Sequence, residues 1–64
     1  MNEEVLKSLL TSEQLEALEA ISKRYNKKVD LKKVYLGASL PNDWIFYDLG
    51  RIQVGISPQG NIHS

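Results

Sequence analysis

The chain has 64 residues, 42% of them hydrophobic and 25% charged, and its formal net charge at neutral pH is zero. This length allows one domain, which we expect to span residues 1–64, and the ordinary hydrophobic fraction excludes a disordered chain. The balanced charge argues against a strong general attraction to nucleic acid or an anionic membrane, and no apolar run approaches the roughly 20 residues that a membrane-spanning helix needs.

Residues 2–26 are predicted to be helical. Thr11 has the side chain of an N-cap, and Gln14 can complete a capping box with it, so a helix is expected to begin at residue 12. Apolar residues recur at helical spacing from there to residue 25, and Asn26 suits a left-handed position at the C-terminal end. A shorter apolar stripe over residues 2–10 predicts a further helix. This helix either ends before Thr11 or continues into the next as one long helix.

The connecting segment, residues 27–33, is basic and has no clear hydrophobic period. Together with the end of the preceding helix it gathers the basic side chains Lys23, Arg24, Lys27, Lys28, Lys32 and Lys33. With Tyr25 and Tyr35 interleaved, this stretch could bind the phosphates and bases of nucleic acid, or another polyanion. The alternative is a solvated helix end and loop, which the neutral overall charge favours. Asp30 is expected to be a helix cap or a local charge partner.

The pattern changes to that of strands over residues 34–63. Residues 34–40, 44–49 and 52–56 are apolar and rich in β-branched or aromatic side chains, and the last of these segments alternates most clearly. Turns containing proline at 40–43 and 57–60 separate the strands, and residues 61–63 could return as a short edge. The sequence therefore predicts an α+β fold, with one or two N-terminal helices packed on a three-stranded antiparallel β-meander.

The hairpin between the second and third strands decides which face of the sheet is covered. A three-residue loop at 48–50, closed by a left-handed glycine, would place Phe46 opposite Ile52 and Trp44 opposite Val54. That face is the predicted core, covered by the longer helix. The full predicted core is Leu15, Leu18, Ile21, Trp44, Phe46, Ile52, Val54 and Ile56.

The same register leaves Ile45 and Tyr47 on the uncovered face, beside Arg51 and Gln53. One step of register would exchange the two faces, but in either case a two-layer fold leaves a sheet face that carries large apolar groups. Such groups are typical of interface hot spots, so Ile45, Tyr47, Arg51 and Gln53 are the predicted partner-binding residues.

Motifs of catalysis and cofactor binding are absent from the sequence. It contains no phosphate-binding loop, dinucleotide fingerprint or nucleophile elbow. Cysteine is absent, and the only histidine is His63, which has no evident partner. We therefore expect a chain that is not an enzyme and that holds no cofactor or metal.

A small protein-interaction module is the function that these features favour, for example an adaptor, regulator or inhibitor that covers a partner surface. A chain this short has a small core and here lacks disulfides, so self-association, as a homodimer, is expected. The alternative is a nucleic-acid-associated regulator that uses residues 23–33. The acidic N-terminus differs from the basic start of a secretory signal, and with the absence of cysteine this predicts a cytoplasmic location.

Overall fold

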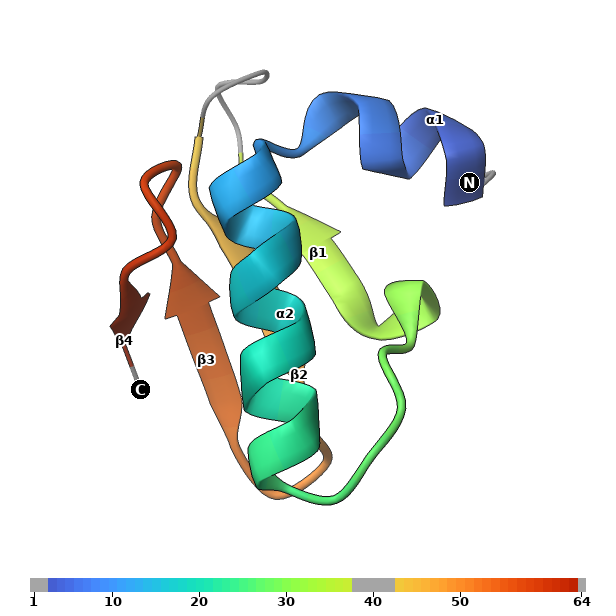
Figure 1. Cartoon of the computed structure of the whole chain (residues 1–64), viewed down its shortest axis with the longest axis vertical. Helices are drawn as coiled ribbons and strands as arrows, with labels where there is room; N and C mark the ends of the chain where they lie inside the picture. Colours follow the sequence, from blue (N-terminus) through green and yellow to red (C-terminus); the bar gives the residue numbers. More distant parts are fainter. Residues whose placement is uncertain (1–2, 38–42, 64) are drawn as a thin grey trace.

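A computed structural model describes residues 3–37 and 43–63 of the chain. Two helices precede an antiparallel sheet, as predicted, so the α+β class is confirmed (Figure 1). The sheet has four strands, because the predicted edge forms a short strand of its own. The elements are α1 (Glu3–Leu9), α2 (Ser12–Arg24), the 3₁₀ helix η1 (Leu31–Lys33), β1 (Val34–Leu36), β2 (Ile45–Asp48), β3 (Gln53–Ile56) and β4 (Ile62–His63).

The two helices are separate because Thr11 caps the second one. The Thr11 hydroxyl accepts a hydrogen bond from the Gln14 N–H at 3.0 Å, and the Gln14 side chain accepts one from the Thr11 N–H at 3.0 Å. This capping box confirms the predicted start of α2 at Ser12. The helix ends at Arg24, and Asn26 takes the left-handed conformation that its side chain tolerates, with φ 58°.

The connecting segment contains η1, which the sequence pattern did not indicate. Asp30 is the N-cap of η1, which is one of the two roles predicted for it. Its carboxylate accepts a hydrogen bond from the Lys32 N–H at 3.0 Å. Leu31 is buried, and it anchors the segment beside α1. Residues 38–40 of the predicted first strand and most of the predicted turn at 40–43 lie outside the described residues.

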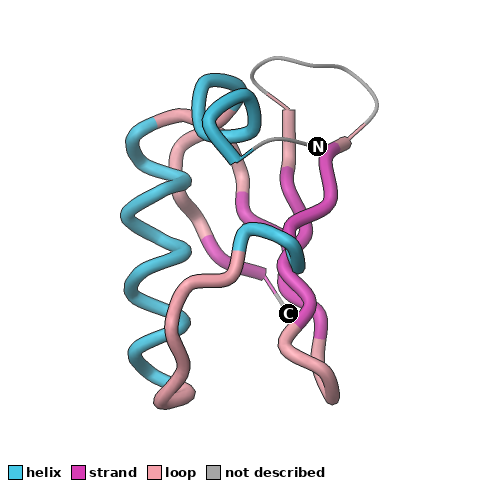
Figure 2. The backbone as a smooth tube through the Cα atoms, turned by 90° about the vertical axis from the view of Figure 1, so that its right-hand side faces the viewer, coloured by secondary structure: helices cyan, strands magenta, loops and turns pink. Residues whose placement is uncertain are grey.

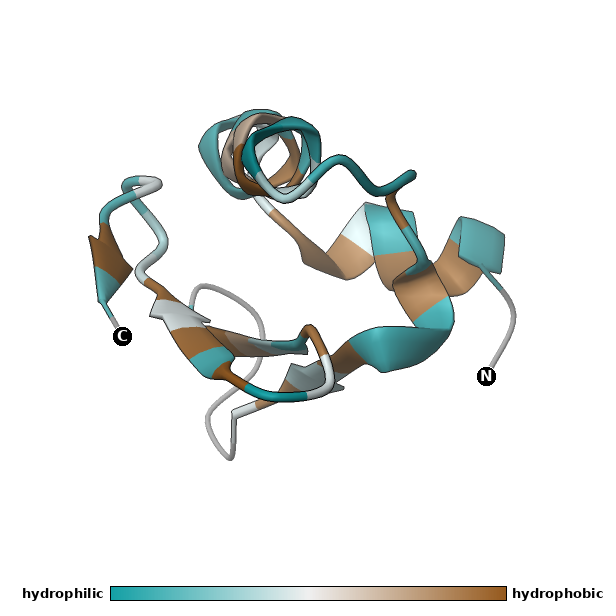
Figure 3. Cartoon of the chain, turned by 90° about the horizontal axis from the view of Figure 1, so that it is seen from below, coloured by the Kyte–Doolittle hydropathy of each residue, from teal (hydrophilic) through white to brown (hydrophobic). Residues whose placement is uncertain are grey.

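The sheet has the order β1-β2-β3-β4, and each strand is antiparallel to its neighbours. Helix α2 lies across one face of this sheet, as Figures 2 and 3 show from two directions. No described segment lies over the opposite face (Figure 2). The fold therefore has two layers, one sheet face packed on the helix and the other facing solvent.

The core lies between α2 and the covered face of the sheet. Of the predicted core residues, Leu18, Ile21, Val54 and Ile56 are buried, and Leu15 packs against the core while partly buried. The prediction is wrong for three residues that the structure places at the surface, Trp44, Phe46 and Ile52. The buried apolar residues are Leu6, Leu10, Ala17, Leu18, Ile21, Leu31, Val34, Ile45, Tyr47, Leu49, Val54 and Ile56.

Two buried polar side chains of α2 join the helix to the sheet. The Gln14 amide donates to the carbonyl oxygens of Asp43, at 2.9 Å, and Ile56, at 3.3 Å. The Ser22 hydroxyl and the Tyr47 hydroxyl are 2.8 Å apart, and the Asp30 N–H donates to the Tyr47 oxygen at 3.2 Å. Every buried side-chain nitrogen and oxygen of the described part has a hydrogen-bond partner. These bonds fix how the helix sits on the sheet.

Candidate functional site: the uncovered face of the sheet

A row of residues crosses all four strands on the uncovered face. Tyr35 of β1 lies opposite Phe46 of β2, Phe46 lies opposite Gly55 of β3, and Gly55 lies opposite His63 of β4. Directly opposed residues of antiparallel strands point to the same face, so these four positions share the face away from α2. Tyr35 is 51% exposed and Phe46 is 40% exposed. We call these four residues the cross-strand row.

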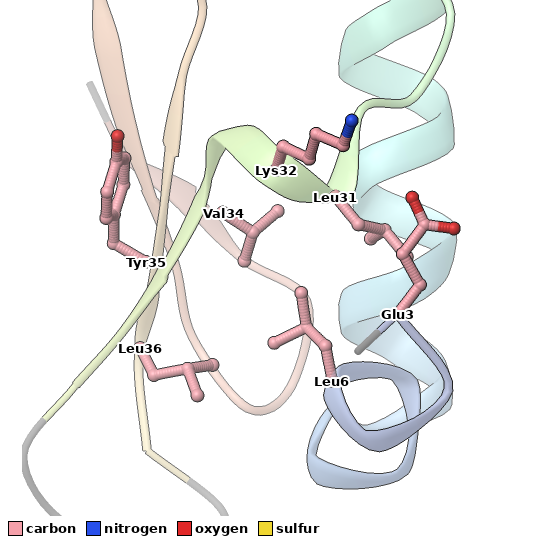
Figure 4. A pocket seen from close by; sticks show the side chains of 7 residues that line it. All are labelled: Glu3, Leu6, Leu31, Lys32, Val34, Tyr35 and Leu36. Carbon is pink, nitrogen blue, oxygen red and sulfur yellow. The ribbon is translucent and has the colours of Figure 1, made fainter. Parts of the chain in front are cut away.

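Figure 4 shows the alternation of the two faces at β1. Val34 and Leu36 point toward Leu6 of α1 and Leu31 of η1, whereas the ring of Tyr35 lies on the other side of the strand. The hollow between α1 and β1 has a volume of about 410 Å³, with Glu3 and Lys32 also in its lining. Leu6, Leu31 and Val34 are each less than 10% exposed, so these three side chains present little apolar surface to the hollow.

Trp44 adds a large ring to the uncovered face. Its position, two residues before Phe46 on the same strand segment, puts it on the same side of the sheet. The Trp44 and His63 ring centroids are 5.0 Å apart with a tilt of 55°, and the indole is 37% exposed. The indole therefore reaches from β2 across β3 to β4. We call Tyr35, Trp44, Phe46 and His63 the aromatic strip.

Glycine at position 55 makes room for the strip. A Cβ atom on Gly55 would lie 3.2 Å from Cε3 of Trp44 and 3.6 Å from Cε1 of Phe46. The first distance is tighter than an ordinary van der Waals contact, so a side chain here would displace the indole. The glycine thus lets the indole lie close against the backbone of β3.

Two of the predicted partner-binding residues lie in the core, Gln53 lies on the uncovered face, and Arg51 lies in the hairpin loop. Ile45 and Tyr47 are each 1% exposed, so the prediction that they lie on the uncovered face is wrong. Arg51 and Gln53 are exposed, as predicted. Ile45 and Tyr47 therefore belong to the core and cannot contact a partner while the domain is folded.

The length of the hairpin loop explains why Ile45 and Tyr47 face the core. Asp48 lies opposite Gln53, and the Leu49 N–H donates to the Ile52 carbonyl oxygen at 2.9 Å, so the loop has four residues, 49–52. Phe46 consequently lies opposite Gly55 where the prediction placed Ile52, a shift of three residues. An odd shift exchanges the two faces of a strand pair. Only the left-handed Gly50, with φ 97°, is as predicted.

No local signal in the sequence favoured the observed register. Residues 44–49 carry large apolar side chains at odd and at even positions, so the hydrophobic pattern does not identify which face of the strand is the core face. Leu49 is buried at the start of the loop, at a position where a turn residue is usually polar.

The residues predicted to bind a polyanion do not all face one hollow. Lys27, Lys28 and Lys33 line a hollow of about 280 Å³ with Asp30 and Asp48, at the hairpin end of the molecule. The ammonium of Lys27 also donates to the Leu49 carbonyl oxygen at 3.3 Å. Lys23 lines a second hollow beside α2 together with Lys27 and Lys28, whereas Arg24 and Lys32 line two further hollows, beside α2 and beside α1.

Ionisable groups supply little further chemistry in the residues that the structure describes. Glu13 is fully exposed, and a hydrogen bond from the Ser12 hydroxyl, at 2.6 Å, lowers the pKa of its carboxyl group. Within residues 3–37 and 43–63, no three histidine, cysteine or acidic side chains gather where they could hold a metal ion. None of the described helices has the length and apolar character to cross a bilayer.

Comparison of the chain with known protein families, with curated proteins and with solved structures gave no match. The function of the chain is therefore inferred from the geometry of this face.

Proposed function

We propose that the chain is a small non-catalytic protein-interaction module and that its binding surface is the aromatic strip. The observation that supports this proposal is the exposure of three aromatic side chains, Tyr35, Trp44 and Phe46, on a sheet face that no described element covers. With about 200 Å² per aromatic residue, their exposed fractions amount to about 250 Å². Covering that area contributes about 6 kcal/mol before the cost of association is subtracted.

The strip is suited to binding because its largest ring is already held in place. The indole of Trp44 lies against Gly55 on one side and contacts the His63 ring at its end. A side chain that is ordered before binding loses little conformational entropy when a partner covers it. Aromatic residues are also enriched among the residues that contribute most to interface energy.

Nucleic acid is the second candidate, since bases also stack on aromatic residues of an open sheet. The observation that favours it is the hollow lined by Lys27, Lys28 and Lys33, which shares Asp48 with the uncovered face. Two considerations favour a protein partner. Asp30 and Asp48 offset part of the positive charge of that hollow, and the chain as a whole is neutral.

A comparison of three variants tests the proposal. The first is Trp44→Ala/Phe46→Ala, which removes the centre of the strip. The second is Lys27→Ala/Lys28→Ala/Lys33→Ala, which removes the cations of the hollow. The third is a control, Val5→Ala, which deletes an apolar side chain that is 50% exposed on α1. Circular dichroism and urea denaturation establish that each variant folds.

Two measurements on these variants separate the candidates. Proteins of the native host that bind the wild-type chain, quantified by mass spectrometry, should be lost from the strip variant and retained by the other two. Fluorescence anisotropy with a single-stranded oligonucleotide at two salt concentrations measures any binding to nucleic acid, which should be weak in all variants. If only the lysine variant loses binding, and its target is the oligonucleotide, the function moves to the basic hollow and our proposal is rejected.

A further inference from the structure

We infer that β1 binds an extended peptide segment of a partner protein, which pairs with the free edge of β1 as an additional antiparallel strand of the sheet. This inference goes beyond the proposed function, because it concerns an edge of the sheet and not the aromatic strip. Three observations carry it: the place of β1 in the sheet, the direction of its backbone hydrogen-bonding groups, and the hollow beside it.

Strand β1 lies at one edge of the sheet. The strand order is β1-β2-β3-β4, and within the residues that the structure describes β1 pairs only with β2. Figure 1 shows β1 as the outermost strand on the right of the sheet. An edge strand carries backbone N–H and C=O groups that no neighbouring strand pairs, and such groups are a template for another extended chain.

The register of β1 and β2 shows which backbone groups point to the free edge. The Gly37 N–H donates to the Trp44 carbonyl oxygen at 3.0 Å, so these two residues form a hydrogen-bonded pair. Hydrogen-bonded and non-hydrogen-bonded pairs alternate along an antiparallel ladder. Tyr35 therefore also directs its backbone groups to β2, whereas Val34 and Leu36 direct theirs to the free edge.

Three of the four edge-facing groups are left for a partner. The Val34 N–H donates to the Leu31 carbonyl oxygen of η1, which leaves the Val34 C=O and both backbone groups of Leu36. An antiparallel strand can pair all three. One of its residues exchanges two hydrogen bonds with Leu36, and the residue two positions further along donates its N–H to the Val34 carbonyl oxygen.

The hollow beside β1 receives side chains of the added strand. A peptide residue opposite Leu36 points to the same face as Leu36, which is the side of the hollow between α1 and β1 (Figure 4). Leu36 packs against the core but is only partly buried, and the hollow has a volume of about 410 Å³. An apolar side chain placed there covers Leu36. Glu3 and Lys32 contribute one charge of each sign to the lining, so the hollow favours an uncharged side chain.

Tyr35 gives the next peptide residue a neighbour on the opposite face. That residue points to the uncovered side of the sheet, beside the Tyr35 side chain, which is 51% exposed. Pairs of an aromatic and a β-branched side chain on adjacent strands are favourable. The expected occupant is therefore an extended segment that alternates apolar residues, directed to the hollow, with β-branched residues.

Synthetic peptides of this pattern test the inference. The probes are nonapeptides that carry valine, leucine, isoleucine or phenylalanine at every second position, threonine between them, and lysine and glutamate at the two ends. Binding to the full chain is measured by NMR titration of its backbone amides. At least one probe should bind saturably, with the largest shifts at β1. The absence of saturable binding by all of the probes overturns the inference.

Hydrogen exchange of the Leu36 amide reports the pairing directly. In the free chain this amide should exchange at least about tenfold faster than the amide of Phe46, which lies within the ladder of β1 and β2. Bound peptide should slow it by about tenfold or more. A Leu36 amide that is already protected in the free chain overturns the inference, and protection that rises with chain concentration would identify a second copy as the occupant.

N-methylated probes test the direction of the added strand. In the antiparallel arrangement the apolar residues direct their N–H groups to β1, and the threonines direct theirs to solvent. N-methylation of the apolar residues should weaken binding about tenfold or more, and N-methylation of the threonines should weaken it less than about threefold. Equal effects overturn strand addition, and the reverse order overturns the antiparallel direction.

A variant of the edge itself tests the same bond from the other side. Leu36→Pro removes the outward N–H without removing a hydrogen bond to β2, and Leu36→Val, which keeps this N–H, is its matched control. The proline variant should bind the probes about tenfold more weakly, and the control should stay within about threefold. Circular dichroism and urea denaturation establish that both fold. A folded proline variant that binds as the wild type overturns the inference, and if this variant does not fold, the N-methylated probes decide.

The variant Trp44→Ala/Phe46→Ala separates the inference from the proposed function. It should bind the probes within about threefold of the wild type, because the edge of β1 remains. If it loses the probes while Leu36→Pro retains them, the peptide binds the aromatic strip, so the inference is rejected and the proposed function stands. If it retains both the probes and the host partner while Leu36→Pro loses the probes, the inference stands and the proposed function is rejected.

Discussion

Tyr47→Phe should lower the free energy of unfolding by about 1–3 kcal/mol, although it removes a single oxygen atom. The Tyr47 hydroxyl is paired with the Ser22 hydroxyl at 2.8 Å and accepts the Asp30 N–H at 3.2 Å. Both tyrosine and serine are 1% exposed, so water cannot replace the lost partner without a rearrangement. The cost of leaving buried hydrogen-bonding groups unpaired therefore sets the size of the expected decrease in the free energy of unfolding.

Tyr47→Ala should cost more, about 3–5 kcal/mol, because it also leaves a cavity between α2 and the sheet. A domain of this length has a total stability of about 3–10 kcal/mol, so this variant should be largely unfolded. Phe46→Ala, one residue away but on the uncovered face, should cost less, about 1–2 kcal/mol, since Phe46 is 40% exposed and its removal leaves no enclosed cavity. Tyr35→Phe is the control for loss of an exposed hydroxyl, and it should change stability by less than about 0.5 kcal/mol.

Urea denaturation followed by circular dichroism measures these differences, and thermal unfolding gives an independent value. For a chain of this size, 1 kcal/mol corresponds to about 7 °C in Tm, so Tyr47→Phe should melt about 7–20 °C below the wild type. The protein concentration is kept low and constant, because self-association would add to the apparent stability. A mild Tyr47→Ala together with an unfolded Phe46→Ala would show that the two sheet faces are exchanged relative to the structure.

Three further predictions concern α2 and the turn packed against its start. Gln14→Ala should lower the free energy of unfolding by about 2–4 kcal/mol in urea denaturation, because it leaves two carbonyl oxygens and one N–H without their partner. Gly60→Ala should cost more than about 1 kcal/mol by the same assay, since Gly60 has φ 88° and its added Cβ would lie 2.9 Å from the Glu13 carbonyl oxygen. Ser12→Ala should raise the pKa of Glu13 toward its ordinary value, which an NMR titration measures. Because the folded pKa is lowered, ionised Glu13 favours folding above its unfolded pKa, and this contribution is lost as the pH falls through the folded pKa. In Ser12→Ala that loss on acidification should be smaller.

The local signals in the sequence determined the elements and several of their ends. Thr11 and Gln14 identify the start of α2 because a capping box depends only on side chains within one helical turn. Asn26 and Gly50 occupy their left-handed positions for an equally local reason, since few other residues tolerate that conformation. The order of two helices followed by antiparallel strands, and hence the α+β class, follows from such signals.

The tertiary structure alone decided which side of the sheet is the core. Trp44, Phe46, Ile45 and Tyr47 are all large and apolar, so the strand carries no hydrophobic alternation that could orient it. The choice depends on contacts between segments far apart in the chain. The Tyr47 hydroxyl is hydrogen-bonded to the hydroxyl of Ser22 on α2, 25 residues earlier in the chain. This bond can form only when the tyrosine faces the helix. Trp44 and Phe46 are left on the outside, where the glycine at position 55 receives the indole, and the candidate site follows from that placement.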